Sequence, residues 1–166
     1  MKMNEKELEL LEILEGNART PLETIADMME MEKQEIEGMI KSLEERDIIL
    51  NYQAVINWDQ VPSNDGVTAM IDVKVAPKRE IGFDGVAERI YRFPEVKAVY
   101  LMSGAYDLSV QIEGKTMKEV AFFVSKKLST LDSVLSTTTH FLLKKYKHDG
   151  VIFEPEHKDK RVVVSP

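Results

Sequence analysis

The stretch VKAVYLMSGAYDLSVQIEG (Val96 to Gly114) contains two strand-like runs and a short connection between them. VKAVYLMSG and YDLSVQIEG are rich in apolar, β-branched and aromatic residues, which is typical of strands. Small residues occupy the connection at Ser103–Ala105, where the chain must turn tightly. The stretch therefore predicts two neighbouring strands joined by a tight turn.

Helix-like and strand-like runs lie on both sides of this pair. VTAMIDVKVAP predicts a strand with its apolar residues on one face and Asp72 and Lys74 on the other, and FDGVAERIYRF predicts a helix that ends before Pro94. TMKEVAFFVSKKLSTL predicts a second helix and VLSTTTHFLLKKY a last strand. The order β-α-β-β-α-β is the split, ferredoxin-like arrangement. With both helices on one face, the sheet leaves an uncovered face with apolar residues, which we expect to pack against another subunit.

The first sixty residues predict three short helices. Gly16 is placed to end the first as a C′ glycine, and Thr20, Pro21 and Glu23 form a capping signature for the second. The third is expected in MEKQEIEGMIKSLEERD (Met31 to Asp47), after a brief turn, which matches a helix-turn-helix. The residues expected to face inward are Leu10, Leu11, Ile13, Leu14, Leu22, Ile25, Ala26, Met29, Ile36, Met39, Ile40 and Leu43.

These patterns predict an α+β protein with two domains, which fits a length of 166 residues. Residues 1–50 would form a helix-turn-helix, winged-helix-like domain, and residues 51–65 an extended connector. A strand is expected within IILNYQAVINW (Ile48 to Trp58), and the turn-rich segment VPSNDG (Val61 to Gly66) marks the domain boundary. Residues 66–146 would form the ferredoxin-like domain. Residues 147–166 would be a tail, in which RVVV could add a short strand.

Composition excludes several classes of protein. The chain has no cysteine, which excludes disulfides and thiolate metal sites and fits a reducing cytoplasm. The N-terminus lacks a signal peptide and no segment is apolar enough to cross a membrane, so we expect a cytoplasmic protein without a membrane partner. The three histidines lack metal-ligand spacing, and no nucleophile motif or phosphate loop occurs. We therefore expect no catalytic residue, metal or cofactor.

The net charge of −7 is unevenly distributed. Residues 1–60 hold 6 Lys or Arg and 15 Asp or Glu, residues 61–113 hold 6 and 8, and residues 114–166 hold 10 and 6. A net charge of −9 over the helical region opposes binding to a polyanion, because affinity for DNA depends on Lys and Arg at the phosphates.

The order of these elements resembles the Lrp/AsnC (leucine-responsive / asparagine-regulator) family of prokaryotic transcription factors over about residues 4–146. The resemblance rests on LLEILEGNART, SLEERDIILNYQAVIN, FPEVKAVYLMSGAYDLSV and STTTHFLL, and above all on Gly104, Ala105, Tyr106 and Asp107, which match the Gly-x-Tyr-Asp of the family. It implies a regulator that binds double-stranded DNA through its helix-turn-helix. It also implies dimers that assemble into octamers or similar homo-oligomers, and an effector site for a small molecule, often an amino acid, at a subunit interface near this turn.

The turn offers the groups that a free amino acid needs. Asp107 could accept hydrogen bonds from the ammonium, and small residues would let the carboxylate reach backbone N–H groups. The structural alternative is an ordinary turn in which Asp107 bonds the backbone and three threonines serve as strand residues. Alternation places Thr137 and Thr139 on one face and Thr138 on the other. The candidate effector-binding residues are Met102, Ser103, Gly104, Ala105, Tyr106, Asp107, Thr137, Thr138 and Thr139.

The predicted reading helix departs from the family, in which Ser, Thr and Arg are usual here. Glu37, Gly38 and Met39 stand where an arginine would be expected. Gln and Glu can still contact bases, and many copies in one assembly can add weak contacts. The alternative is an oligomeric small-molecule-binding module whose acidic helical domain contacts protein and has lost DNA binding. The candidate DNA-binding residues are Arg19, Lys33, Gln34, Glu35, Glu37, Gly38, Lys41 and Ser42.

Overall fold

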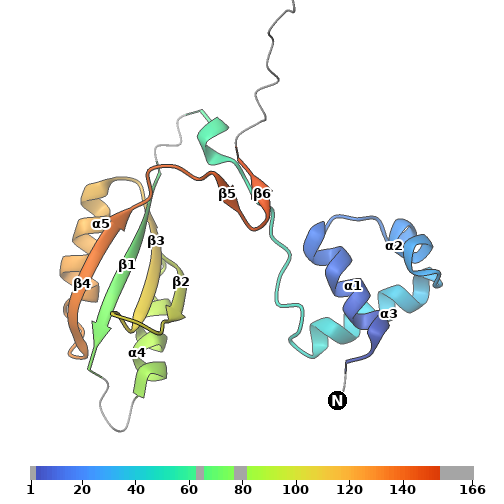
Figure 1. The fold of residues 1–166 in the computed structure, drawn as a ribbon, viewed down its shortest axis with the longest axis horizontal. Helices are drawn as coiled ribbons and strands as arrows, with labels where there is room; N and C mark the ends of the chain where they lie inside the picture. Colours follow the sequence, from blue (N-terminus) through green and yellow to red (C-terminus); the bar gives the residue numbers. More distant parts are fainter. Residues whose placement is uncertain (1–2, 63–65, 77–81, 154–166) are drawn as a thin grey trace, which may run out of the picture. The chain divides into compact units, whose positions relative to one another are not determined.

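A computed structural model describes residues 3–62, 66–76 and 82–153 of the chain. The chain divides into two compact units, Met1–Ile56 and Asn57–Pro166 (Figure 1). The residue limits predicted above for the domains stay predictions. No helix among the described residues is both long and apolar enough to span a bilayer.

The first unit contains three helices, α1 (Glu5–Gly16), α2 (Leu22–Met29) and α3 (Lys33–Glu45). They enclose a core to which each contributes the apolar positions that the sequence indicated. The fully or nearly buried residues are Leu10, Leu14, Ile25, Ala26, Met29, Ile36 and Leu43. The other predicted positions, Leu11, Ile13, Leu22, Met39 and Ile40, are partly buried against this core. Each fully buried aliphatic side chain contributes about 1.5–3 kcal/mol through its removal from water.

Two predictions about helix ends are wrong. Gly16 is the last residue of α1, and Asn17 in extended backbone follows as its C-cap. Thr20 does not cap α2, because its hydroxyl donates a hydrogen bond of 2.8 Å to the carbonyl of Asn17. The N-cap position belongs to Pro21, and Glu23 is engaged elsewhere.

The connector after α3 contains no strand between residues 48 and 57, contrary to the sequence prediction. An extended segment becomes a strand only where its N–H and C=O groups pair with a neighbouring strand, and no described strand pairs with this segment. Its start is held to α3 by a hydrogen bond of 2.9 Å from the Tyr52 hydroxyl to Glu44. The short 3₁₀ turn η1 (Trp58–Gln60) follows.

The second unit contains a four-stranded antiparallel sheet with strand order β2-β3-β1-β4. Helices α4 and α5 cover one face of this sheet (Figure 1). The chain order β-α-β-β-α-β confirms the predicted ferredoxin-like fold. The elements are β1 (Val67–Val75), α4 (Gly82–Tyr91), β2 (Val96–Leu101), β3 (Leu108–Gly114), α5 (Met117–Phe123), its π-helical extension η2 (Val124–Leu128) and β4 (Val134–Phe141).

Alternate residues of the strands form the core beneath the helices. In β1 these are Ala69, Ile71, Val73 and Val75, as the period of two predicts, and β3 adds Leu108, Val110 and Ile112. The helices contribute Val86, Ile90, Val120, Phe123 and Leu128.

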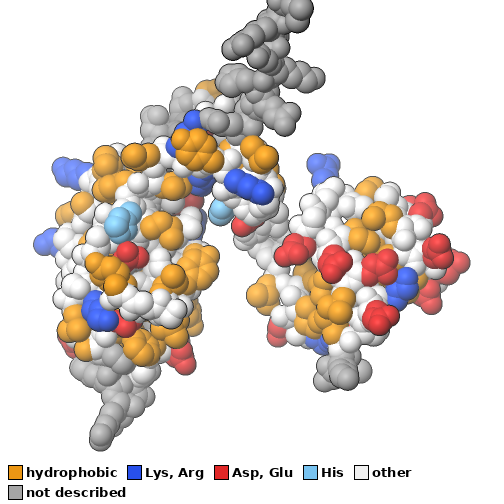
Figure 2. Space-filling model, in the orientation of Figure 1, with side chains coloured by type: hydrophobic (Ala, Val, Ile, Leu, Met, Phe, Trp, Pro, Cys, Tyr) orange, Lys and Arg blue, Asp and Glu red, His pale blue; other side chains and the backbone are white. Residues whose placement is uncertain are grey.

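The other face of the sheet carries mixed side chains, whereas the sequence emphasised apolar ones (Figure 2). The strand register places Tyr100, Ser109, Asp72 and Thr138 in one row across this open face. Gln111, Met70 and His140 continue the next row. Polar pairs thus occupy much of the face that no helix covers.

The last described residues form a small hairpin that the sequence analysis did not predict. β5 (Lys147–His148) pairs with β6 (Val151–Ile152) across Asp149 and Gly150. Both central residues have positive φ, +45° and +77°, as a type I′ hairpin turn requires. The predicted last strand ends earlier than expected, at Phe141, and RVVV lies outside the described residues.

Candidate functional site

The turn between β2 and β3 is closed by backbone hydrogen bonds. The Met102 N–H donates to the Asp107 carbonyl at 2.8 Å, and the Asp107 N–H donates to the Val73 carbonyl on β1 at 3.1 Å. Gly104 has φ of +148°, so a side chain there would strain the backbone even though the surrounding space is open. Residues 102–105 are exposed and Tyr106 and Asp107 are half-buried.

Asp107 already has donors on both carboxylate oxygens. Its Oδ2 accepts the Val75 N–H at 2.8 Å, and its Oδ1 lies 3.4 Å from the Lys74 ammonium. Lys74 also donates to the Ala105 carbonyl at 3.3 Å. The backbone contact is the structural alternative that the sequence left open, and the Lys74 contact is a partner that the sequence analysis missed. An external ammonium would therefore have to replace Lys74 at Oδ1.

Three successive backbone N–H groups of the turn differ from those of Met102 and Asp107, which are hydrogen-bonded. Within the described residues, the N–H groups of Ser103, Gly104 and Ala105 donate no hydrogen bond. Three exposed donors in succession, beside the Lys74 ammonium, form a concentration of positive partial charge. Together with Asp107, they place donors and an acceptor within one short segment.

Only one of the three candidate threonines lies with the turn. The Tyr106 hydroxyl and the Thr138 hydroxyl are 2.9 Å apart and share a hydrogen bond across the open face. Thr137 pairs with Val73 and Thr139 with Ile71, so both lie on the helix-covered face. The expected alternation is confirmed. The neighbouring His140 Nε2 lies 3.1 Å from Asp72 on the open face, another pair that the sequence analysis missed.

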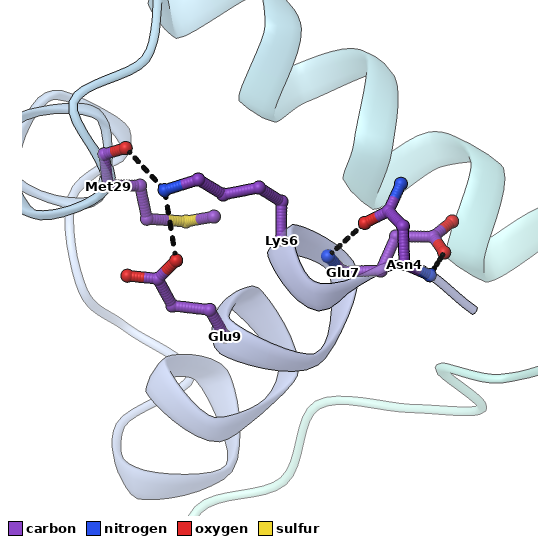
Figure 3. A network of polar contacts seen from close by, with 5 residues as sticks. All are labelled: Asn4, Lys6, Glu7, Glu9 and Met29. Atoms are coloured by element: carbon purple, nitrogen blue, oxygen red, sulfur yellow. Dashed lines mark hydrogen bonds and ion pairs between the residues drawn. The ribbon is translucent and has the colours of Figure 1, made fainter.

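In the helical unit, most described cations are bound by carboxylates of the same unit. Lys33 pairs with Glu23 at 2.6 Å, and the remaining pairs are Lys6–Glu9, Lys41–Glu45 and Arg46–Glu7. Figure 3 shows Lys6 between the Glu9 carboxylate and the Met29 carbonyl, beside the capping contacts of Asn4 and Glu7. Arg19 is exposed, and its guanidinium has no partner among the described residues. The unit therefore offers little free positive charge.

The ion pairs have electrostatic consequences in α2 and α3. The hydrogen bond from Lys33 lowers the pKa of Glu23, and the same bond, together with the charge of Glu23, raises the pKa of Lys33. At neutral pH both side chains are charged and directed at each other. A phosphate that approached Lys33 would compete with a carboxylate that is already in place.

The exposed face of α3 contains most of the candidate DNA-binding residues, two of which, Glu35 and Glu37, are carboxylates, while Ser42 is half-buried. Gln34, Glu37, Gly38 and Lys41 are exposed, while the Glu35 side chain accepts the Glu32 N–H at 3.2 Å at the start of the helix. Figure 2 shows many Asp and Glu side chains and few Lys or Arg on the visible face of this unit. The structure thus exposes the residues expected at a major groove but surrounds them with negative charge.

Known proteins resemble this chain in both of its units. The model of the Lrp/AsnC ligand binding domain matches residues 68–152. Over 166 residues, all of both chains, the sequence is 63% identical to the HTH-type transcriptional regulator YugG of Bacillus subtilis. It is 30% identical over 145 residues to the HTH-type transcriptional regulator LrpA of Pyrococcus horikoshii, with 87% of this chain and 99% of that one covered.

Solved structures share the fold at lower identity. The complex of transcriptional regulator NMB0573 from Neisseria meningitidis with L-Met has a TM-score of 0.71 at 22% identity, and covers 89% of this chain and 94% of that one. AsnC of E. coli has a TM-score of 0.68 at 19% identity, with 89% and 97% covered. At these identities, the similarity shows a shared fold.

Proposed function

Because the chain belongs to the Lrp/AsnC family of HTH-type transcriptional regulators, we propose that it binds a free amino acid at the turn between β2 and β3. The chain is a transcriptional regulator with a ligand-binding domain, and not an enzyme. The L-Met complex of NMB0573 supports an amino acid as the class of effector. The bound effector would change how the helical units engage DNA.

The observation that carries this proposal is the Lys74–Asp107 pair beside three backbone N–H groups that have no partner among the described residues. A zwitterion matches this arrangement. Its carboxylate would accept from Ser103, Gly104 and Ala105 and from the Lys74 ammonium, and its own ammonium would take the place of Lys74 at Asp107 Oδ1. Lys74 is 42% exposed, so its side chain can leave Asp107 without breaking a packed core.

A thermal-shift screen of the free amino acids against the full chain tests the effector. A ligand present at 100 times its dissociation constant stabilises the folded state by about 2.7 kcal/mol. We expect one amino acid, or a few related ones, to raise the melting temperature, and the corresponding amides and amines to fail. No shift with any amino acid would contradict the proposal.

DNA binding is proposed to be weak per subunit and to depend on assembly. The Arg19 guanidinium has no partner in the described part of the chain, and Gln34 and Lys41 are exposed on α3, but the charge of the unit opposes approach to phosphates. Dimers that assemble into octamers or similar oligomers would add these weak contacts through effective concentration. An effector that binds one assembly state more tightly would shift the population of states, and with it DNA binding.

Electrophoretic mobility shifts with DNA from the protein's own promoter region test this second step. At low salt we expect a shift that is lost steeply as salt rises, since each phosphate contact adds about −0.9 to the slope of log K against log salt. No shift at low salt, with or without amino acids, would contradict DNA binding.

A second function is favoured by the internal ion pairs of the helical unit. Four of the five Lys or Arg residues among residues 3–56 are held by carboxylates of the same unit. An acidic surface of this kind suits a basic protein partner better than a nucleic acid. The same salt titration decides between them, because a protein-binding module would not bind DNA at any salt concentration.

A further inference from the structure

A cavity of about 530 Å³ lies at the other end of β3, beside α5. Its volume falls within the range of small-molecule sites, roughly 300–1,000 Å³. Its apolar lining is formed by Ile112, Val120, Phe122 and Phe123, and Glu95 and Lys127 contribute opposite charges.

The cavity is separate from the turn that carries the proposed effector site. Strand β3 begins at Leu108, next to that turn, and ends at Gly114, in the cavity wall. Six steps of about 3.3 Å put roughly 20 Å between the two ends of the strand. A single small ligand therefore cannot occupy both places.

Glu95 has one occupied and one unoccupied carboxylate oxygen. Oε1 forms an ion pair with Lys127, while Oε2 is buried and has no hydrogen-bond partner in the described part of the chain. The hydrogen bond from Lys127 lowers the pKa of Glu95, so the carboxylate is charged at neutral pH. A buried charged oxygen without a donor is costly, which makes it a place where an additional donor would bind favourably.

Two aromatic rings complete the surroundings of the Lys127 ammonium. Its Nζ lies 5.5 Å from the ring centre of Phe93 and 5.9 Å from that of Phe123, and these rings meet edge to face. Aromatic faces with a carboxylate form a favourable environment for an ammonium group. Lys127 therefore occupies a site whose chemistry would suit the ammonium of a ligand.

The segment that carries Lys127 can release it. Lys127 lies in η2, a π-helical turn, and such turns are rare and frequent at functional sites. Its side chain is 40% exposed, so it can move into water without loss of core packing. At the rim, Phe122 is 61% exposed, an aromatic ring available to a ligand.

We propose that this cavity is a second small-molecule site, which binds an organic amine with an apolar body. The ligand's ammonium would replace that of Lys127 at Glu95, between Phe93 and Phe123, and its apolar part would lie against Phe122 and Val120. The other carboxylates of the wall already have partners, because Glu113 pairs with Lys97 and Glu119 accepts the Lys115 N–H. The proposal does not depend on the amino-acid site at the turn.

Calorimetric titration of the full chain with phenethylammonium tests the site. Phenylacetate and 2-phenylethanol are controls of similar shape with negative and no charge. We expect phenethylammonium to bind at least tenfold more tightly than either control. The Glu95→Gln variant should lose at least tenfold in affinity, and Lys127→Met should gain affinity because it removes the internal competitor.

Matched variants separate this site from general effects. Glu88→Gln removes an exposed carboxylate of α4 that pairs with Arg92, and it should leave the affinity unchanged. Phe122→Ala alters only an exposed ring and should weaken binding several-fold even if Glu95→Gln impairs folding. Asp107→Asn should have no effect.

Three results would each overturn the proposal. Phenethylammonium could fail to bind to both the wild type and Lys127→Met. Phenylacetate could bind as tightly as phenethylammonium, which would assign the cavity to anions through its lysines. Asp107→Asn, rather than Glu95→Gln, could abolish binding, which would place the amine at the turn.

Discussion

Two lysine–carboxylate pairs, one in each unit, have opposite consequences for binding. Lys33 and Glu23 lie 2.6 Å apart on the helical unit, and Glu37 adds a further negative charge near Lys33. Lys74 and Asp107 lie 3.4 Å apart beside backbone N–H groups that have no partner in the described chain. In the first pair, Glu23 neutralises a lysine on an acidic surface. In the second, two opposite charges lie next to backbone N–H groups that have no partner in the described chain. An ion pair therefore indicates a ligand site only where further unpaired donors or acceptors lie beside it.

The largest effect is expected from Asp107→Asn. The amide oxygen can still accept the Val75 N–H, so the turn should keep its shape while the negative charge is lost. A hydrogen bond to a charged group contributes roughly 1.5–3 kcal/mol, which predicts amino-acid binding about 10- to 150-fold weaker. Calorimetric titration measures it, with Asp72→Asn on the same face as the control. Wild-type affinity in Asp107→Asn would remove this residue from the site.

A smaller effect is expected from Glu37→Arg on the exposed face of α3. The change replaces a negative charge by a positive one where phosphates would lie, and one new phosphate contact adds about −0.9 to the salt slope. DNA affinity at low salt should rise roughly 3- to 10-fold, as measured by fluorescence anisotropy. Glu15→Arg at the end of α1 is the control for a general change of charge. Equal gains from both variants would show that α3 has no special position on DNA.

Gly38→Ala should stabilise the helical unit by up to about 1 kcal/mol, because glycine is a poor helix former and nothing lies within 4 Å of an added Cβ. Chemical denaturation measures the gain. If the stabilised variant also binds DNA as the wild type does, Gly38 serves no close approach to the backbone of DNA. A loss of stability would mean that α3 is strained at this point.

The smallest effect concerns the pair that joins α1 to the end of α3. The Asn4 N–H, and after it the Arg46 side chain, lower the pKa of Glu7 from its usual 4.5. A depressed folded-state pKa gives stability that is present above about pH 4.5 and lost as the pH falls through the lower value. Glu7→Gln should flatten the fall of melting temperature below pH 4.5. Arg46→Met should retain most of the fall of melting temperature below pH 4.5. If Arg46→Met instead abolished that fall, Arg46 rather than the Asn4 N–H would be the larger cause of the lowered pKa of Glu7.

Periodicity was sufficient to predict the helices and the order of strands. Ile25, Ala26 and Met29 recur at the spacing of one helix face, and alternate residues of β1 are buried, so each element could be inferred from its own residues. The prediction of a strand in the connector was wrong because a strand needs a partner strand, and the local sequence pattern does not show whether one is present. The hairpin at Asp149–Gly150 was missed although the dipeptide Asp-Gly is a strong local signal of a hairpin turn.

The candidate site could be predicted only in part for the same reason. The turn and its small residues were evident in the sequence, but Lys74 and Asp107 are 33 positions apart and meet through the register of β1 and β3. Thr138 joins the turn through Tyr106, a contact that alternation permits but does not identify. Glu95 and Lys127, 32 positions apart, likewise meet only in the folded chain.

Hydrogen exchange of the full chain, measured by mass spectrometry with and without each free amino acid, is the decisive test of amino-acid binding at the turn between β2 and β3. We expect an effector amino acid to slow exchange in the segment that contains Ser103, Gly104 and Ala105, whose N–H groups donate no hydrogen bond within the described residues. We also expect Asp107→Asn to abolish this protection. Protection confined to other segments, or exchange at this turn that no amino acid alters, would rule out amino-acid binding there.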